Sequence, residues 1–123
     1  MSKVFLDTNV LIYSVDKDSP DKRDDALTLL KRIGHSVSTV VSTQVLQEFY
    51  SAAIGELYIS SEEARMLLVK FTVFEVVQVT IERILRAVDI SAFHQLSFWD
   101  SLFISTAEAA RYETLLTENM NDG

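Results

Sequence analysis

A short apolar segment near the N-terminus ends abruptly in a carboxylate, and this feature places the strongest constraint on the fold. Val4-Phe5-Leu6 has no helical period and contains β-branched and aromatic residues, which is typical of a strand covered on both faces. Asp7-Thr8-Asn9 then predicts a turn, and a helical segment is expected to begin at Val10. A carboxylate at the end of a buried strand is costly to remove from water unless it has a partner. The rest of the chain must therefore indicate what the partner of Asp7 is.

Short apolar segments predict strands along the whole chain, and longer segments with apolar residues every three or four positions predict helices between them. The expected strands cover residues 4–6, 37–41, 74–80 and 114–117. The expected later helices cover about 20–33, 44–54, 61–72, 81–93 and 98–112. Strands joined through helices form parallel sheets with helices on both faces. The sequence therefore predicts an α/β fold, a three-layer α/β/α sandwich with a central parallel sheet, as one domain over residues 1–123.

Capping residues mark the ends of several predicted helices. Ser19-Pro20 is typical of a helix start, because Ser caps well and Pro is tolerated at the first helical position. Gly34 is expected to end that helix in a left-handed conformation, and Thr43 is expected to cap the next one. Ser60 or Ser61 is expected to begin the helix after that.

The charge and the missing residue types exclude several classes of function. The chain has 11 Lys and Arg against 18 Asp and Glu, and its net charge of −7 has the wrong sign for binding nucleic acid by bulk attraction. The absence of cysteine excludes disulfides and thiolate chemistry and favours a cytoplasmic location. Three glycines form no phosphate-binding loop, and no apolar run has the ~18 residues that a membrane span needs. The remaining candidates for chemistry are acidic.

Three acids and one amide are the candidate site residues, and each has a simpler alternative role. Asp7 can instead form the turn and cap the helix after it. Asp100 follows Ser97 at the spacing of a capping box, although the apolar helix that it begins predicts a carboxylate mostly out of water. Glu48 lies beside the apolar face of its helix and can be simply solvated. Asn119 alone indicates only a turn.

These residues gain significance together, because ligands of parallel α/β sheets bind at the carboxyl ends of the strands. Asp7 follows the first predicted strand and Asn119 follows the fourth. A hard cation such as Mg²⁺ takes one or two carboxylates, with water and phosphate oxygens completing its shell. Such a cation would also allow an acidic protein to meet a polyanion. The pattern therefore predicts a site for a hard divalent cation such as Mg²⁺, which can act on a phosphodiester.

Four motifs span almost the whole chain. They are Phe5-Leu6-Asp7-Thr8-Asn9-Val10-Leu11-Ile12-Tyr13, Gln47-Glu48-Phe49, Leu96-Ser97-Phe98-Trp99-Asp100-Ser101-Leu102 and Leu115-Leu116-Thr117-Glu118-Asn119-Met120. In this order they resemble the motifs of the PIN-domain ribonucleases and, within that family, of the VapC-like toxins of toxin–antitoxin pairs. The resemblance implies Mg²⁺- or Mn²⁺-dependent cleavage of RNA, a homodimer, and silencing by an antitoxin protein.

The same resemblance implies roles for individual residues. Asp7, Glu48 and Asp100 are expected to be three of the acidic metal-site residues of the family. Asn9 is expected to support Asp7 through side-chain hydrogen bonds. The fold implied is a parallel sheet between helices, with the acids converging at one edge of the sheet.

Two departures from the family pattern bear on activity. The family usually carries Asp where this chain has Asn119, and an amide can coordinate through its oxygen but adds no negative charge. Family members also usually continue into a final strand beyond the position of Gly123, so that strand is expected to be missing from this chain. A catalytically impaired PIN-fold binding module that acts through an antitoxin is therefore the alternative to a nuclease. A phosphatase or nucleotide-binding protein is disfavoured, because no phosphate loop is present.

Overall fold

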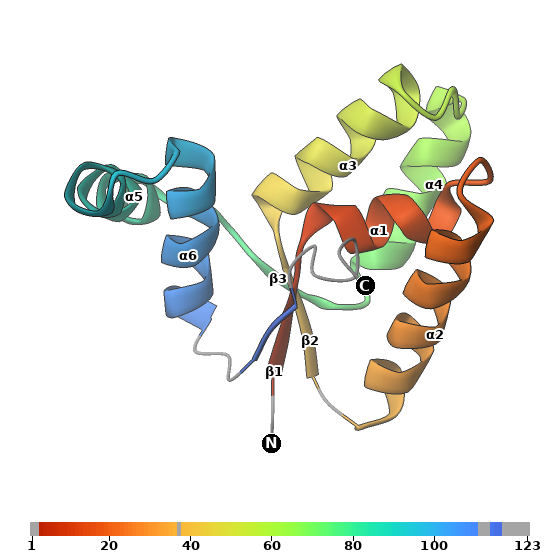
Figure 1. The fold of residues 1–123 in the computed structure, drawn as a ribbon, viewed down its shortest axis with the longest axis horizontal. Coiled ribbons are helices and arrows are strands. Elements are labelled where there is room, and N and C mark those ends of the chain that lie inside the picture. The colour runs from red at the N-terminus through yellow and green to blue at the C-terminus, as the bar shows by residue number, and fades with distance from the viewer. Residues whose placement is uncertain (1–2, 37, 111–113, 117–123) are drawn as a thin grey trace.

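The computed structural model describes residues 3–36, 38–110 and 114–116, in which short strands and helices follow one another along the chain (Figure 1). In chain order the elements are β1 (Lys3–Leu6), α1 (Thr8–Val15), α2 (Pro20–Ser36), β2 (Ser38–Ser42), α3 (Thr43–Gly55), α4 (Ser61–Phe71), β3 (Glu75–Val77), α5 (Ile81–His94), α6 (Phe98–Ala110) and β4 (Thr114–Leu116). Each described helix falls short of the length and apolar character that a bilayer span demands.

The strands form one parallel sheet with the order β3-β2-β1-β4, which confirms the predicted parallel α/β fold. The chain adds β2 and β3 on one side of β1 and then returns to place β4 on the other side. The strand order therefore reverses beside β1, and open α/β sheets bind ligands at such a point, outside the carboxyl ends of the strands. Leu6 of β1 is paired with Leu116 of β4, and Asp7 follows directly after this pair.

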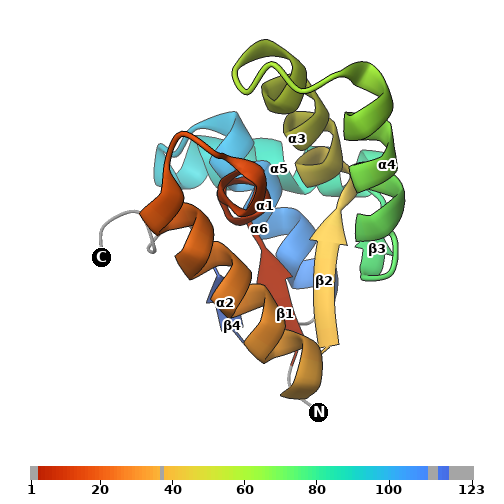
Figure 2. The same cartoon turned by 90° about the vertical axis from the view of Figure 1, so that its right-hand side faces the viewer.

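Alternate residues of the inner strands enter two separate cores, because successive side chains of a strand point to opposite faces. Val4 and Leu6 pack with α1, α3 and α4, whereas Phe5 packs with α6. In β2, Val41 belongs to the first core and Val40 to the second. Figure 1 shows α1 to α4 on one side of the sheet and α5 and α6 on the other, and Figure 2 looks onto the α1–α4 layer. The predicted three-layer sandwich is confirmed.

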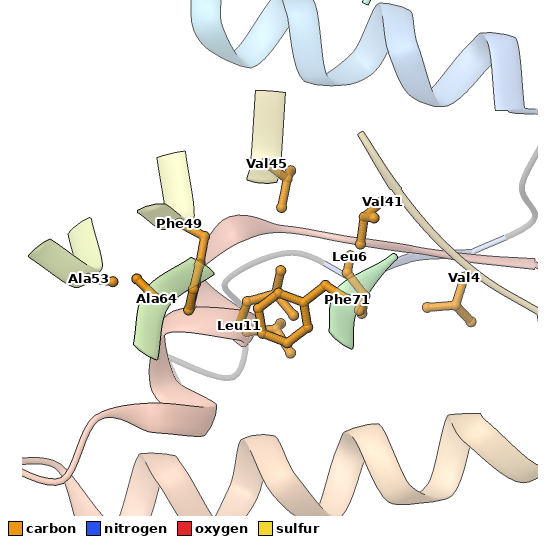
Figure 3. Close-up of a cluster of buried hydrophobic side chains, with 10 residues drawn as sticks. Val4, Leu6, Leu11, Val41, Val45, Phe49, Ala53, Ala64 and Phe71 are labelled. Carbon is orange, nitrogen blue, oxygen red and sulfur yellow. The ribbon is translucent and has the colours of Figure 1, made fainter. Parts of the chain in front are cut away.

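The core between the sheet and helices α1, α3 and α4 is closed by apolar side chains from several elements (Figure 3). Phe49 of α3 is fully buried and meets Phe71 of α4 edge-on, with the ring centroids 4.9 Å apart. Leu11 of α1 is fully buried in the same core. These contacts hold α3 against α1 and the sheet, and they leave the neighbouring Glu48 on the surface of the helix.

Helix α6 covers the other face of the sheet, and α5 packs on the outside of α6 (Figure 1). The two helices are joined by polar contacts: Ser105 Oγ donates to the Arg83 carbonyl at 2.8 Å, and Arg83 Nη1 donates to the Ser105 carbonyl at 3.1 Å. Arg86 donates twice to the carboxylate of Glu108, at 3.1 and 3.2 Å, and this hydrogen bonding lowers the pKa of Glu108. Large apolar side chains on α5 remain exposed, namely Ile81, Leu85, Val88 and Phe93.

Two predictions about the N-terminal helices are wrong in detail. Helix α1 begins at Thr8 rather than at Val10, so the turn after β1 is shorter than expected. Gly34 does not end α2, which continues to Ser36, and no described glycine has a positive φ. A glycine inside a helix costs only about 1 kcal/mol relative to Ala, so the remainder of a 17-residue helix can carry it.

The cap of α3 is also displaced by one residue from its predicted position. Ser42 caps this helix, and its Oγ accepts from the Val45 N–H at 3.1 Å. Thr43 is instead the first helical residue, and its Oγ1 accepts a hydrogen bond from the Val79 N–H at 3.1 Å. The Thr43 hydroxyl thus serves the segment after β3, which leaves Ser42 to begin the helix. For α4 the choice between two serines is resolved in favour of Ser60.

Candidate active site

Asp7 lies in the turn between β1 and α1, at the carboxyl end of an inner strand. Its backbone is extended, with φ −82° and ψ 155°, and it occupies the N-cap position of α1. The side chain of Asp7 makes no capping hydrogen bond, so the alternative role of a helix cap is not observed. The turn is held by the backbone, because the Asp7 carbonyl accepts from the Val10 N–H at 3.2 Å. The half-buried carboxylate therefore lies where the strand order reverses without being needed to begin α1.

Glu48, in the second turn of α3, is joined to the turn of Asp7 through Thr8. The hydroxyl Oγ1 of Thr8 donates to Oε1 of Glu48 at 2.7 Å, although 40 residues separate the two in the chain. Glu48 is exposed, but this hydrogen bond means that it is more than a solvated surface side chain. Sequence reasoning did not single out Thr8, and the signal present was its position between Asp7 and Asn9.

Asp100 lies in the first turn of α6, which is capped by Ser97 as the spacing predicted. The Asp100 N–H donates to Ser97 Oγ at 3.1 Å. One turn later, Phe103 meets Phe5 of β1 edge-on, with ring centroids 4.9 Å apart. Residues three apart share a face of a helix. Asp100 therefore lies on the side of α6 that faces β1.

The prediction that Asp100 is mostly out of water is wrong, because this residue is exposed. Among the described elements, β1 and α5 pack against helix α6, on which Leu102 and Ala107 are buried. Glu108 and Ala109 on the same helix face solvent. Asp100 lies about one turn before Phe103, whose ring contacts Phe5 of β1, and its side chain is left exposed.

Of the two amides among the predicted site residues, Asn9 lies within the described residues and Asn119 does not. Asn9 lies half-buried in the first turn of α1, and the hydrogen bonds predicted from it to Asp7 stay a prediction. Asn119 lies outside the described residues. The sequence places it shortly after Leu116, the residue of β4 that pairs with Leu6.

The starts of α1, α3 and α6 lie at the same end of the sheet (Figure 1). Each of the three candidate acids belongs to one of these regions: Asp7 precedes α1, Glu48 is in the second turn of α3, and Asp100 is in the first turn of α6. The fold therefore brings the acids to the carboxyl edge of the sheet, which is the edge where such folds bind ligands.

The donor set at this edge has the chemistry that a hard divalent cation requires. Asp7, Glu48 and Asp100 offer carboxylate oxygens, which suit Mg²⁺ and Mn²⁺. Within the described ranges, no three Asp, Glu or His side chains are grouped tightly enough to hold one ion by themselves. Mg²⁺ commonly uses only one or two protein carboxylates and keeps several waters. The carboxylates present are therefore chemically compatible with a Mg²⁺ site.

Comparison with known proteins agrees with this architecture. The pattern that defines the PIN-domain family matches residues 4–120. The fold is similar to a chain of a toxin–antitoxin complex from Klebsiella pneumoniae, with a TM-score of 0.69 and 26% sequence identity over 98% of this chain and 89% of that one. It is also similar to a chain of VapBC2 from Rickettsia felis bound to a DNA fragment from its promoter, with a TM-score of 0.69 and 18% identity over 98% of this chain and 90% of that one. At 18% identity, the similarity to the Rickettsia felis chain is a similarity of fold alone.

No curated protein sequence matches this chain at a significant level. The family pattern nevertheless covers nearly every residue, and it includes the strand that precedes Asp7 and the starts of α3 and α6. The chain therefore belongs to the PIN-domain family.

Proposed function

We propose that this protein is a metal-dependent RNA endonuclease and the toxin of a toxin–antitoxin pair, similar to the VapC toxins. The observation that carries the proposal is the arrangement at the carboxyl edge of the sheet. Asp7 lies where the strand order reverses, and Glu48 accepts a hydrogen bond from Thr8, the residue after Asp7. Asp100 lies in the first turn of α6, on the side that faces β1. Membership of the PIN-domain family supports nuclease chemistry at this edge.

Each residue at the edge has a proposed role. Asp7 and Asp100 would hold the principal cation, and Glu48 would bind a second cation or orient the attacking water. Asn119 would complete the shell through its amide oxygen. A Mg²⁺ or Mn²⁺ ion held by these residues would activate a water molecule as the nucleophile and would stabilise the leaving oxygen of the phosphodiester. The expected products carry 5′-phosphate and 3′-hydroxyl ends.

Removal of divalent cations is the direct test of metal dependence. Excess EDTA is expected to stop cleavage of a structured RNA, and added Mn²⁺ is expected to restore it. The physical reason is that a chain with a net charge of −7 repels a polyanion unless cations lie between the acids and the phosphates. Cleavage that continues at an unchanged rate in EDTA would contradict the proposal.

The proposed partners are RNA, an antitoxin protein and a second copy of the chain. The antitoxin is supported by the likeness to a toxin–antitoxin complex at 26% identity, and the homodimer by the resemblance of the motifs to VapC-like toxins. Light scattering of the purified protein measures the number of chains directly. A mass of a single chain at all concentrations would argue against the homodimer.

A second candidate function rests on Asn119. An amide in place of the usual acid adds no charge to the shell, so the protein can be a binding module with impaired catalysis that acts through its antitoxin. The substitution Asn119→Asp is expected to raise the rate of RNA cleavage by about 10- to 100-fold, the size of effect typical for groups that tune a metal site.

The two functions are separated by comparing the native chain with Asn119→Asp in the same Mn²⁺-dependent assay. Cleavage by the native chain supports the nuclease, and a faster Asn119→Asp form then assigns the slow step to the missing charge. Cleavage by Asn119→Asp alone supports the binding module with impaired catalysis. If neither form cuts RNA while both bind an antitoxin tightly, the binding module is the correct function.

A further inference from the structure

The contact between Thr8 and Glu48 links two helices at the proposed active site. Thr8 is the first residue of α1, directly after Asp7, and Glu48 lies in the second turn of α3. The donor–acceptor distance of 2.7 Å is typical of a strong hydroxyl–oxygen hydrogen bond. An ionised carboxylate as acceptor strengthens such a bond further.

The two partners differ in freedom, and this decides which one positions the other. Thr8 is 7% exposed, its β-branched side chain has few rotamers, and the fully buried Val10 and Leu11 anchor its helix. Glu48 is exposed and carries a long side chain with several rotatable bonds. The fixed hydroxyl of Thr8 therefore restricts the carboxylate of Glu48, rather than the reverse.

A threonine inside a helix can satisfy its hydroxyl without any partner on another element. Thr106, which is fully buried in α6, does so by donating to the Leu102 carbonyl of its own helix at 2.8 Å. Thr8 is at the start of its helix, where the residue four positions earlier belongs to β1 instead of a preceding turn. The hydroxyl of Thr8 is therefore directed across to α3, where it meets the one acid on that helix near the Asp7 turn.

We infer that Thr8 is a positioning residue for RNA cleavage: its hydroxyl holds the carboxylate of Glu48 at the carboxyl edge of the sheet, beside Asp7. The inference rests on the proposed function. Thr8 has one hydroxyl hydrogen and donates it to Oε1, so Thr8 itself does not occupy Oε2 of the carboxylate. Thr8 thereby orients Glu48 without using the Oε2 atom of Glu48, which would bind the cation or the attacking water.

The test compares Thr8→Val, which removes the hydroxyl at nearly constant volume, with Thr8→Ser, which keeps it. In Thr8→Val we expect kcat for RNA cleavage to fall about 10- to 100-fold and the Mn²⁺ concentration for half-maximal rate to rise, with KM for RNA changed less than about threefold. Thr8→Ser is expected to stay within about threefold of the native kcat. The matched control is Thr106→Val, which removes a buried threonine hydroxyl on α6 and should leave kcat and the Mn²⁺ requirement unchanged.

Native kcat in Thr8→Val, or an equal loss in Thr8→Ser and Thr8→Val, would overturn the inference. A double-mutant cycle tests whether Thr8 and Glu48 are energetically coupled, and it does not depend on RNA cleavage. Denaturant unfolding measures the loss of unfolding free energy in Thr8→Val, in Glu48→Ala and in the double variant. The loss in the double variant is expected to differ from the sum of the two single losses, because each single change breaks the same hydrogen bond. A loss of unfolding free energy in the double variant equal to the sum of the two single losses would overturn the inference, whether or not the protein cleaves RNA. If the native chain cuts no RNA, the proposed function fails, and a non-additive cycle still shows that Thr8 holds Glu48.

Discussion

Replacing Asp7 by Asn is expected to lower the rate of Mn²⁺-dependent RNA cleavage by more than about 100-fold. The loss should exceed the 10- to 100-fold typical of groups that only support a metal ligand, because the carboxylate itself would bind the cation. The amide keeps the shape of the side chain and removes its charge. Because the Asp7 side chain makes no capping hydrogen bond, α1 should begin as before, and the fold should persist. Single-turnover cleavage and thermal unfolding, measured on the same preparations, check both expectations.

The same substitution at Asp24 is the matched control. Asp24 is exposed on α2, a helix that carries none of the candidate site residues, so Asp24→Asn changes the net charge equally and should leave cleavage unaltered. Undiminished cleavage in Asp7→Asn would remove Asp7 from the active site. Equal losses in both variants would assign the effect to overall charge rather than to a cation site.

Replacing Phe49 by Ala is expected to lower the free energy of unfolding by about 3–5 kcal/mol. Phe49 is fully buried and packs edge-on against Phe71, so its removal leaves a cavity between α3, α4 and the sheet. Domains of this size have total stabilities of about 5–15 kcal/mol, so the loss is a large part of the whole. Urea unfolding followed by circular dichroism measures it.

Phe93 of α5 is the control for this experiment. It is the same residue type but 83% exposed, and Phe93→Ala should change the free energy of unfolding by less than about 0.5 kcal/mol. A loss in Phe49→Ala no larger than that in Phe93→Ala would mean that the α3–α4 core does not carry the stability assigned to it.

Features that depend on neighbours in the chain were predicted well from the sequence. The strand at Val4-Phe5-Leu6, the caps Ser60 and Ser97, and the placement of Asp7 at the end of β1 are all confirmed. Strand alternation and the caps at Ser60 and Ser97 are interactions within a few residues, so the local pattern contains the information that decides them.

Features that depend on contacts from other elements were predicted poorly. Thr43 is a residue type that can cap a helix, but its hydroxyl accepts a hydrogen bond from the Val79 N–H in the segment after β3, and Ser42 caps α3 instead. The apolar composition of α6 indicated a buried helix, yet Asp100, which lies about one turn before Phe103, is exposed. The composition of a helix shows how apolar it is, but the elements that pack against the helix determine which of its residues are buried.

By itself the sequence determined that a buried strand ends at Asp7 and that the sheet is parallel, and it predicted acidic candidate residues for the site. The tertiary structure alone decided the strand order that places Asp7 at the reversal beside β1, and the hydrogen bond that joins Glu48 to Thr8. The reason is physical: a hydrogen bond between residues 40 apart forms only when α1 and α3 pack on the same face of the sheet. That packing depends on the shared core around Leu11 and Phe49, to which many distant residues contribute at once.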